Sequence, residues 1–237
     1  MTSLRVGALV VILLFAAGTP AILAMQATPE PAATPVTQPV GLVYPPAAII
    51  HGATLGEWNA RYWQWVTSLP VGENPGQDAT GELCGYGQND PVFFIPGNMP
   101  PCTVPAGIAI FLPVAGTECS TLEPPPFHGE GEDELAACAA ADGDRYTNIS
   151  VVVNGEEIPE VERFRAASPA FTLQLPEENI LAVSAETGRA VADGYALVLA
   201  PLPPGEHEIV MHVEVVDGYA LPDKTLRLTV VKPDAEG

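Results

Sequence analysis

The sequence has few positive charges. Its 237 residues include 9 lysines and arginines against 29 aspartates and glutamates, which gives a formal net charge of −20 at pH 7. A surface with this balance repels the phosphates of nucleic acids and the headgroups of anionic lipids. The composition therefore argues against nucleic acid as a partner. It also argues against any membrane contact beyond one made by the N-terminal segment.

Several catalytic and metal-binding patterns are missing as well. The chain lacks the G-x-S-x-G sequence of a serine nucleophile elbow and the C-x-x-C spacing that zinc sites favour. His207 and His212 have opposite parity, so on one strand their side chains would leave opposite faces. We therefore predict no catalytic residue, no metal ligand and no cofactor. A copper-type site built from His207, Met211 and a distant residue is the alternative.

The N-terminal segment has the pattern of a secretory signal. One cation, Arg5, precedes an apolar run over residues 6–17, and small residues follow it. We predict a signal peptide over residues 1–25, with an uncleaved membrane anchor as the alternative. Residues 26–46 are rich in proline, threonine and alanine and are expected to form an extended linker. A single folded domain is expected over residues 47–237, secreted or held in the cell envelope.

The four cysteines are even in number, which in an exported chain predicts two disulfides. Three pairings are possible. Pairing in sequence order, Cys84 with Cys102 and Cys119 with Cys138, closes the shortest loops and is favoured. The second bond would attach a short alanine-rich helix, predicted over residues 133–141, to the strand before it.

The second half of the chain has the pattern of short β-strands. Apolar and polar residues alternate from Asn148 onward, and turns rich in glycine and proline separate the segments. Asn154-Gly155 is a strong hairpin signal. The pattern predicts a mainly β fold, an antiparallel immunoglobulin-like or jelly-roll-like β-sandwich. An N-terminal aromatic helix and the short cysteine-bearing helix complete it.

The aromatic helix contains every tryptophan of the chain, Trp58, Trp63 and Trp65. Thr54 and Glu57 fit a capping box at its start. At 100° per residue, Trp58 and Trp65 fall on the buried stripe and Ala60 faces away from it. Trp63 projects from the flank of the stripe and needs a separate explanation.

Four motifs stand out along residues 52–215. They are W-x4-W-x-W-x2-S-x-P from Trp58 to Pro70, Cys102-Thr103-Val104-Pro105-Ala106-Gly107, Ala192-Asp193-Gly194-Tyr195 and Pro201-Leu202-Pro203-Pro204-Gly205-Glu206-His207. With these motifs the chain resembles a family of uncharacterised exported proteins from bacteria and archaea. The resemblance carries no activity, since no function is assigned to the family. One departure is Ala196, where the family usually has an aromatic residue after Asp193-Gly194-Tyr195.

Trp63 is the first candidate for a binding site. A tryptophan outside the core, beside hydrogen-bonding neighbours, can stack on a sugar ring or hold a peptide. Asp193, Tyr195 and His207 belong to the shared motifs, and we expect them to converge on Trp63. The alternative is that Trp63 packs against a second layer of the fold.

We therefore expect a non-catalytic extracellular or envelope-associated binding module whose ligand is a glycan or a peptide. A secreted glycan hydrolase that uses carboxylates and a metal-handling exported protein are the alternatives.

Overall fold

The computed structural model describes residues 38–216 and 219–232. The predicted signal peptide over residues 1–25 lies outside the described residues, as does the first part of the predicted linker. Among the residues that the structure describes, no helix is both long enough and apolar enough to cross a membrane.

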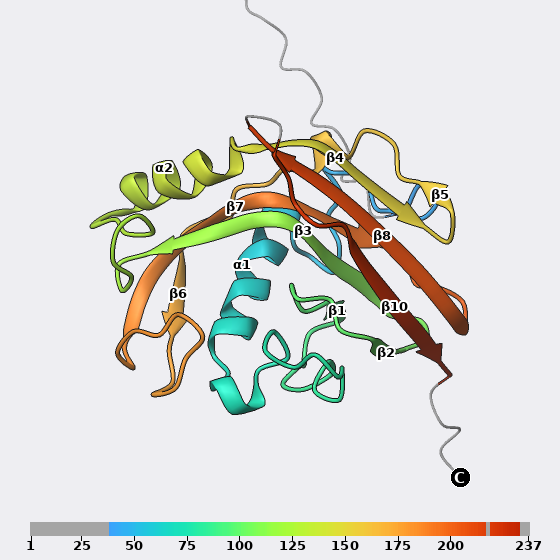
Figure 1. Ribbon diagram of the computed structural model, residues 1–237, viewed down its shortest axis with the longest axis horizontal. Helices are drawn as coiled ribbons and strands as arrows, with labels where there is room; N and C mark the ends of the chain where they lie inside the picture. The colour runs from blue at the N-terminus through green and yellow to red at the C-terminus, as the bar shows by residue number, and fades with distance from the viewer. Residues whose placement is uncertain (1–37, 217–218, 233–237) are drawn as a thin grey trace, which may run out of the picture. The chain divides into compact units, whose positions relative to one another are not determined.

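Two β-sheets pack together, as the sequence predicts for a β-sandwich (Figure 1). The four-stranded sheet has the order β1 (Val92–Phe94), β3 (Ala109–Ser120), β7 (Thr187–Leu199), β6 (Phe171–Gln174). The six-stranded sheet has the order β2 (Cys102–Pro105), β10 (Lys224–Val231), β8 (Gly205–Val215), β4 (Tyr146–Val153), β5 (Glu156–Glu157), and β9 (Tyr219–Ala220) pairs with β8. The mainly β sandwich is therefore confirmed.

Most strand pairs are antiparallel, but each sheet also contains one parallel pair. β1 runs parallel to β3, and β2 runs parallel to β10. Both β1 and β2 come from the region rich in glycine, proline and asparagine that follows the aromatic helix. The alternation of apolar and polar residues along a strand predicts which face is buried. It does not predict whether the neighbouring strand is parallel or antiparallel, so these two parallel pairs could not be predicted from the sequence.

The predicted Asn154-Gly155 hairpin joins β4 to β5. Both residues have positive φ, 52° and 81°. Asparagine and glycine adopt this left-handed conformation at low cost, which is why the dipeptide marks such turns.

The folded body begins earlier than the sequence indicates. Val43 forms a bridge to Leu199 of β7, and the Tyr44 N–H donates to the carbonyl of Val198 at 2.9 Å. The Val43 side chain is buried. The last residues of the predicted linker over 26–46 are therefore part of the sandwich, because they extend the edge of its sheet.

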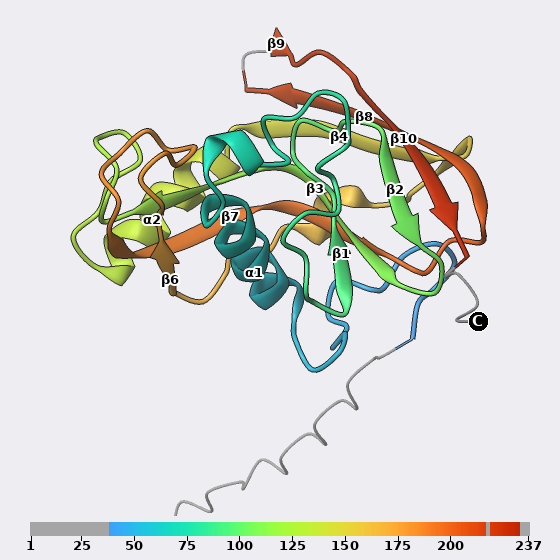
Figure 2. The ribbon, with the colours of Figure 1, turned by 90° about the horizontal axis from the view of Figure 1, so that it is seen from below.

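Two α-helices lie on opposite faces of the four-stranded sheet, α1 (Leu55–Thr67) below and α2 (Glu132–Gly143) above in Figure 1. Short 3₁₀ helices cover Val71–Glu73 and Val161–Phe164. Seen from below, in Figure 2, α1 lies in front of β7 and beside β1. The helix therefore fills the concave side of this sheet.

The predicted capping box starts α1. The Thr54 hydroxyl accepts from the Glu57 N–H, and the Glu57 carboxylate accepts from the Thr54 N–H at 2.7 Å. Trp58 is fully buried and stands 6.1 Å from the Phe94 ring, while Trp65 stacks on Phe94 at 5.5 Å. The buried stripe is confirmed for both tryptophans.

The prediction that Ala60 faces away from the core was wrong. Ala60 is buried in a second apolar cluster with Phe171 and Leu173 of β6. The curved sheet reaches around α1, so the helix is covered on two sides. A prediction that assumes one buried face therefore underestimates the buried surface of this helix.

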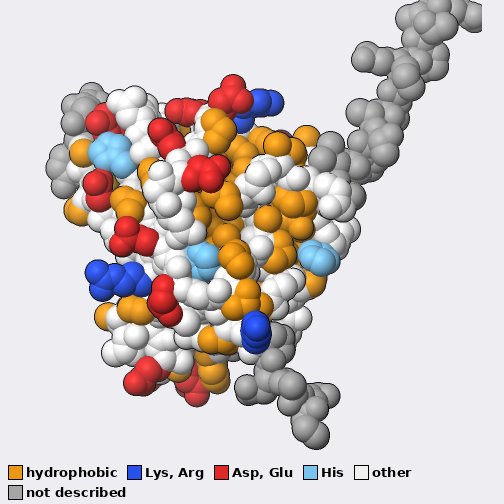
Figure 3. All heavy atoms as spheres, turned by 90° about the vertical axis from the view of Figure 1, so that its right-hand side faces the viewer, with side chains coloured by type: hydrophobic (Ala, Val, Ile, Leu, Met, Phe, Trp, Pro, Cys, Tyr) orange, Lys and Arg blue, Asp and Glu red, His pale blue; other side chains and the backbone are white. Residues whose placement is uncertain are grey.

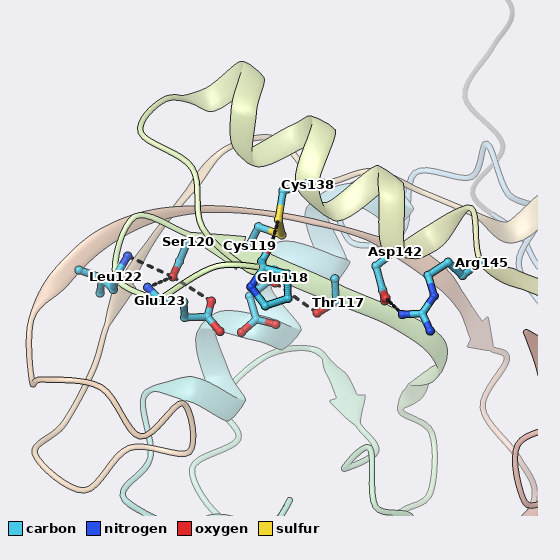
Figure 4. The surroundings of a disulfide bond; sticks show 10 residues. Thr117, Glu118, Cys119, Ser120, Leu122, Glu123, Cys138, Asp142 and Arg145 are labelled. Atoms are coloured by element: carbon cyan, nitrogen blue, oxygen red, sulfur yellow. Dashed lines mark hydrogen bonds and ion pairs between the residues drawn. A yellow bond between two sulfur atoms is a disulfide. The ribbon is translucent and has the colours of Figure 1, made fainter.

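The structure contains the two disulfides in the favoured pairing. Cys84 and Cys102 have Cα atoms 5.6 Å apart, and Cys119 and Cys138 have Cα atoms 6.1 Å apart. The second bond joins β3 to α2, with Cys119 pointing up to the helix in Figure 4. Disulfides persist in oxidising compartments, so they indicate an extracytoplasmic environment.

The surface combines apolar areas with the excess of acidic residues. On the face shown in Figure 3, hydrophobic side chains gather toward the centre, and acidic side chains stand mainly around them. Lysine and arginine are sparse on this face, as the composition implies.

Candidate ligand-binding cavity

A cavity of about 260 Å³ lies between α1 and the two sheets. Tyr62 and Trp63 of α1 form one wall, and Met211 and Val213 of β8 contribute to the opposite one. Lys224, at the start of β10, is exposed to solvent and also lines the cavity. The cavity therefore opens on the side where β10 begins.

Two glycines leave room for the cavity in the floor formed by β3 and β7. Gly116 and Gly194 face one another across the strand pair, and both line the cavity. A Cβ at Gly194 would collide with the backbone of Ala115 and Gly116. Glycine is required there because the two backbones approach closely, and neither residue extends a side chain into the space.

An irregularity in β3 shapes the same region. The register of β3 against β7 shifts between Pro113 and Ala115, which leaves Val114 without a direct partner. All three residues line the cavity. Bulges of this kind bend a strand and redirect its side chains, and they are frequent beside binding sites.

Trp63 is half-buried and contacts both apolar clusters while it lines the cavity. Its ring meets Tyr62 edge-on, with centroids 5.5 Å apart. The indoles of Trp58 and Trp65 donate to backbone carbonyls at 2.9 and 3.0 Å, whereas that of Trp63 has no hydrogen-bond partner among the described residues. Trp63 thus packs against a second layer and also presents part of its surface to the cavity.

Of the residues expected to converge on Trp63, Tyr195 does so and Asp193 does not. Tyr195 lines the cavity from β7. Asp193 is 6% exposed, and its carboxylate accepts two hydrogen bonds from the Arg165 guanidinium, at 3.1 and 3.0 Å. Arg165 also donates to the carbonyl of Ala140 in α2 at 2.9 Å. Asp193 therefore ties β7 to the segment under α2.

His207 also lies away from the cavity. Its Nδ1 is 2.8 Å from the Asn154 amide nitrogen, and its Nε2 is 2.8 Å from the Pro203 carbonyl oxygen. Nδ1 thus accepts and Nε2 donates, so both ring nitrogens are occupied. The expected convergence of His207 on Trp63 was wrong, since the ring closes the turn that enters β8. Within residues 38–216 and 219–232, no three His, Cys, Asp or Glu side chains form a group that could hold a metal ion.

Lys224 lines the cavity but was not predicted as a site residue from the sequence. Its ammonium donates to the carbonyl of Gly97 at 3.0 Å, and it forms no ion pair among the described residues. Partial desolvation of the ammonium lowers the pKa of Lys224. One lysine at the start of a strand has no distinguishing local pattern, because only the packing of β10 beside α1 brings it to the cavity.

Two tyrosines that were also missed line the cavity beside Trp63. Tyr62 is buried, and burial is the main cause that raises the pKa of its hydroxyl. The Tyr146 hydroxyl donates to Asp142 at 2.8 Å, so its polar end is engaged outside the cavity.

Glu118 lies two positions along β3 from Gly116 and is 3% exposed. Figure 4 shows its carboxyl group on the side of β3 opposite the disulfide, with the Glu123 carboxyl group on the same side. Burial first, and then the charge of Glu123, raise the pKa of Glu118 to about 8. Glu118 is therefore neutral near pH 7. Because side chains alternate between the two faces of a strand, the sequence alone could have placed the Glu118 side chain on the face opposite that of Cys119.

No protein-family model matches the chain, and no curated protein matches it. Among solved structures, the solution structure of Amebosin aligns with 60% of this chain and 96% of its own, at 13% identity and a TM-score of 0.19. A similarity of this size carries no argument about fold or function.

Proposed function

We propose that the protein is a non-catalytic binding module of the extracellular space or the cell envelope, and that the cavity beside Trp63 is its ligand site. The observation that carries this proposal is an aromatic, partly open cavity formed by α1 and both sheets. Concave sites of this kind, largely apolar with a few polar groups, are typical of small-ligand binding. The secretory pattern of the first residues and the two disulfides support the location.

The chemistry of the lining favours binding over catalysis. The described residues that line the cavity include no carboxylate, histidine, serine or cysteine. These are the commonest general acids, bases and nucleophiles, and the described lining offers only tyrosines and Lys224 in their place. Glu118 and Glu123 would be the carboxylates of a glycan hydrolase, but neither lines the cavity, so we do not assign them that role.

The size of the cavity limits the ligand. Drug-sized ligands occupy pockets of ~300–1,000 Å³, and this cavity measures about 260 Å³. It therefore suits one ring with small substituents, such as the end of a glycan or one side chain of a peptide. The exposed part of the Trp63 indole would supply the stacking surface.

The test is ligand screening with a matched pair of variants. Monosaccharides, short oligosaccharides and short peptides are screened by ligand-observed NMR, and hits are measured by calorimetry. Trp63→Leu should abolish binding, while a cooperative unfolding transition in urea shows that the variant is still folded. Arg61→Leu changes a neighbour on α1 that does not line the cavity, and it should bind as the wild type does.

Retained affinity in Trp63→Leu, or no binding by any compound of the screen, would overturn the proposed site. If Trp63→Leu fails to fold, Met211→Ala removes side-chain surface from the opposite wall and takes its place. Loss of binding in a folded Met211→Ala variant supports the site, and unchanged affinity contradicts it.

A further inference from the structure

The cation at the mouth of the cavity is unusual for this chain. Most described arginines pair with acids, as Arg61 does with Asp90 and Arg189 with Glu132. Lys224, Arg227 and Lys232 form no ion pair among the described residues. Of these three, only Lys224 lines the cavity. In a chain with 29 acids and 9 bases, such an unpaired cation is uncommon, and even the adjacent Asp223 carboxylate is paired with His212, at 2.7 Å, instead of with Lys224.

The Lys224 ammonium keeps hydrogen-bonding capacity for a ligand. An ammonium group has three donors, and the structure uses one of them on the carbonyl of Gly97 at 3.0 Å. A carbonyl partner does not neutralise the charge. Partial desolvation without a counter-ion disfavours the charged form, and an incoming anion would restore it.

Nothing in the cavity opposes a negative ligand. No carboxylate is among the described lining residues. The nearest acid along β3, Glu118, is held neutral at pH 7 by burial. Because the net charge of the protein is −20, an anion reaches the site only if the local field favours it, and Lys224 is the group that supplies such a field.

From these contacts we propose that the cavity binds a single six-membered ring that carries a carboxylate, with the ring against Trp63 and the carboxylate on the Lys224 ammonium. This inference rests on the proposed binding function and specifies its ligand. Two sources share the chemistry: a uronic acid at the end of a glycan, and a small aromatic acid. The uronic acid presents the C–H groups of one ring face and the aromatic acid a flat ring face, and each carries an anionic group at the ring edge.

The experiment compares acids with neutral compounds of the same ring. Calorimetry measures D-glucuronate against D-glucose, and 4-hydroxybenzoate against 4-hydroxybenzyl alcohol, with the wild-type protein at pH 7. One acid should bind at least about tenfold more tightly than its neutral counterpart, since a charge-assisted hydrogen bond contributes about that factor. The acid that binds identifies the source.

Variants of Lys224 test the contact itself. Lys224→Met keeps the length of the side chain without its charge, and it should lower the affinity for the acid to that of the neutral compound. Lys224→Arg keeps the charge and should retain most of the affinity. Lys232→Met removes a lysine away from the cavity and should change nothing, which controls for the overall charge.

Failure of this inference can be distinguished from failure of the proposed function. If neutral rings bind as tightly as acids, or if Lys224→Met leaves the affinity unchanged, the carboxylate assignment is wrong while a Trp63-dependent site stands. If neither acid binds the wild type, the ligand class is wrong, and the glycan and peptide screen decides separately whether the cavity is a binding site.

Discussion

Glu118 should make the protein less stable as the pH rises through the neutral range. Its carboxyl group is buried, and its pKa is raised from an ordinary value of 4.5 to about 8. Between these two values the folded state holds a proton that the unfolded chain has released. The free energy of unfolding therefore falls with rising pH, by roughly 1 kcal/mol per pH unit from this group and by a few kcal/mol over the whole window.

The assay is urea unfolding at several values between about pH 5 and about pH 8, a range set by the two pKa values of the linkage relation. Glu118→Gln keeps the shape of the side chain without an ionisable group, so its stability should depend less steeply on pH than that of the wild type. Part of the slope will remain, because burial also raises the pKa of Glu123. Contributions from His128 and His212, whose pKa values are raised by hydrogen bonds to acids, are common to both proteins and cancel in the difference.

Glu177→Gln is the control, since Glu177 is an exposed acid of the same type. It should leave the wild-type slope unchanged. Equal slopes for the wild type and Glu118→Gln would show that folding does not raise the pKa of Glu118. A carboxyl group that is protonated in the folded state and ionised in the unfolded state must contribute to the slope.

Two further substitutions test the contacts around the site. Trp58→Phe removes the indole that donates to the buried carbonyl of Ile50 at 2.9 Å, and it should cost about 1–3 kcal/mol of unfolding free energy by urea denaturation; a cost near zero would show that this hydrogen bond does not hold the start of α1. Arg165→Met leaves the buried Asp193 carboxylate without its guanidinium partner and should cost about 3–5 kcal/mol at pH 7. A loss of about 1 kcal/mol or less, the size expected of an exposed ion pair, would contradict the electrostatic explanation.

Local patterns in the sequence predicted the features that depend on local physics. The Thr54–Glu57 capping box, the Asn154-Gly155 turn and the alternating strands of the second half each need only neighbouring residues. The pairing of the cysteines followed from the short loops that it closes. These features were predictable because the residues that determine them are close together along the chain.

The cavity could not be predicted in the same way. Lys224 and Trp63 are far apart in sequence, and the packing of β10 and α1 brings both to one cavity. Asp193 stands in the same motif as Tyr195, and His207 ends a second motif, but the fold sends their side chains to Arg165 and to the turn before β8. The two motifs therefore identified one lining residue, Tyr195, and two residues that stabilise the fold.

The division of the three tryptophans also needed the structure. Helical periodicity separated Trp63 from Trp58 and Trp65, and the structure shows that the three indoles also differ in their hydrogen bonds. Two indoles donate to backbone carbonyls, and among the described residues the third has no such partner and lines a cavity.

The most direct test of the binding site is the indole N–H region of a ¹⁵N spectrum, recorded while the best-binding ring compound is added. The three tryptophans give three indole signals, assigned by substituting each in turn. The Trp63 signal should move in proportion to bound ligand, while the signals of Trp58 and Trp65 should stay in place because their N–H groups donate to the carbonyls of Ile50 and Tyr86, respectively. A Trp63 signal that does not move when the ligand is bound would contradict the proposed binding site.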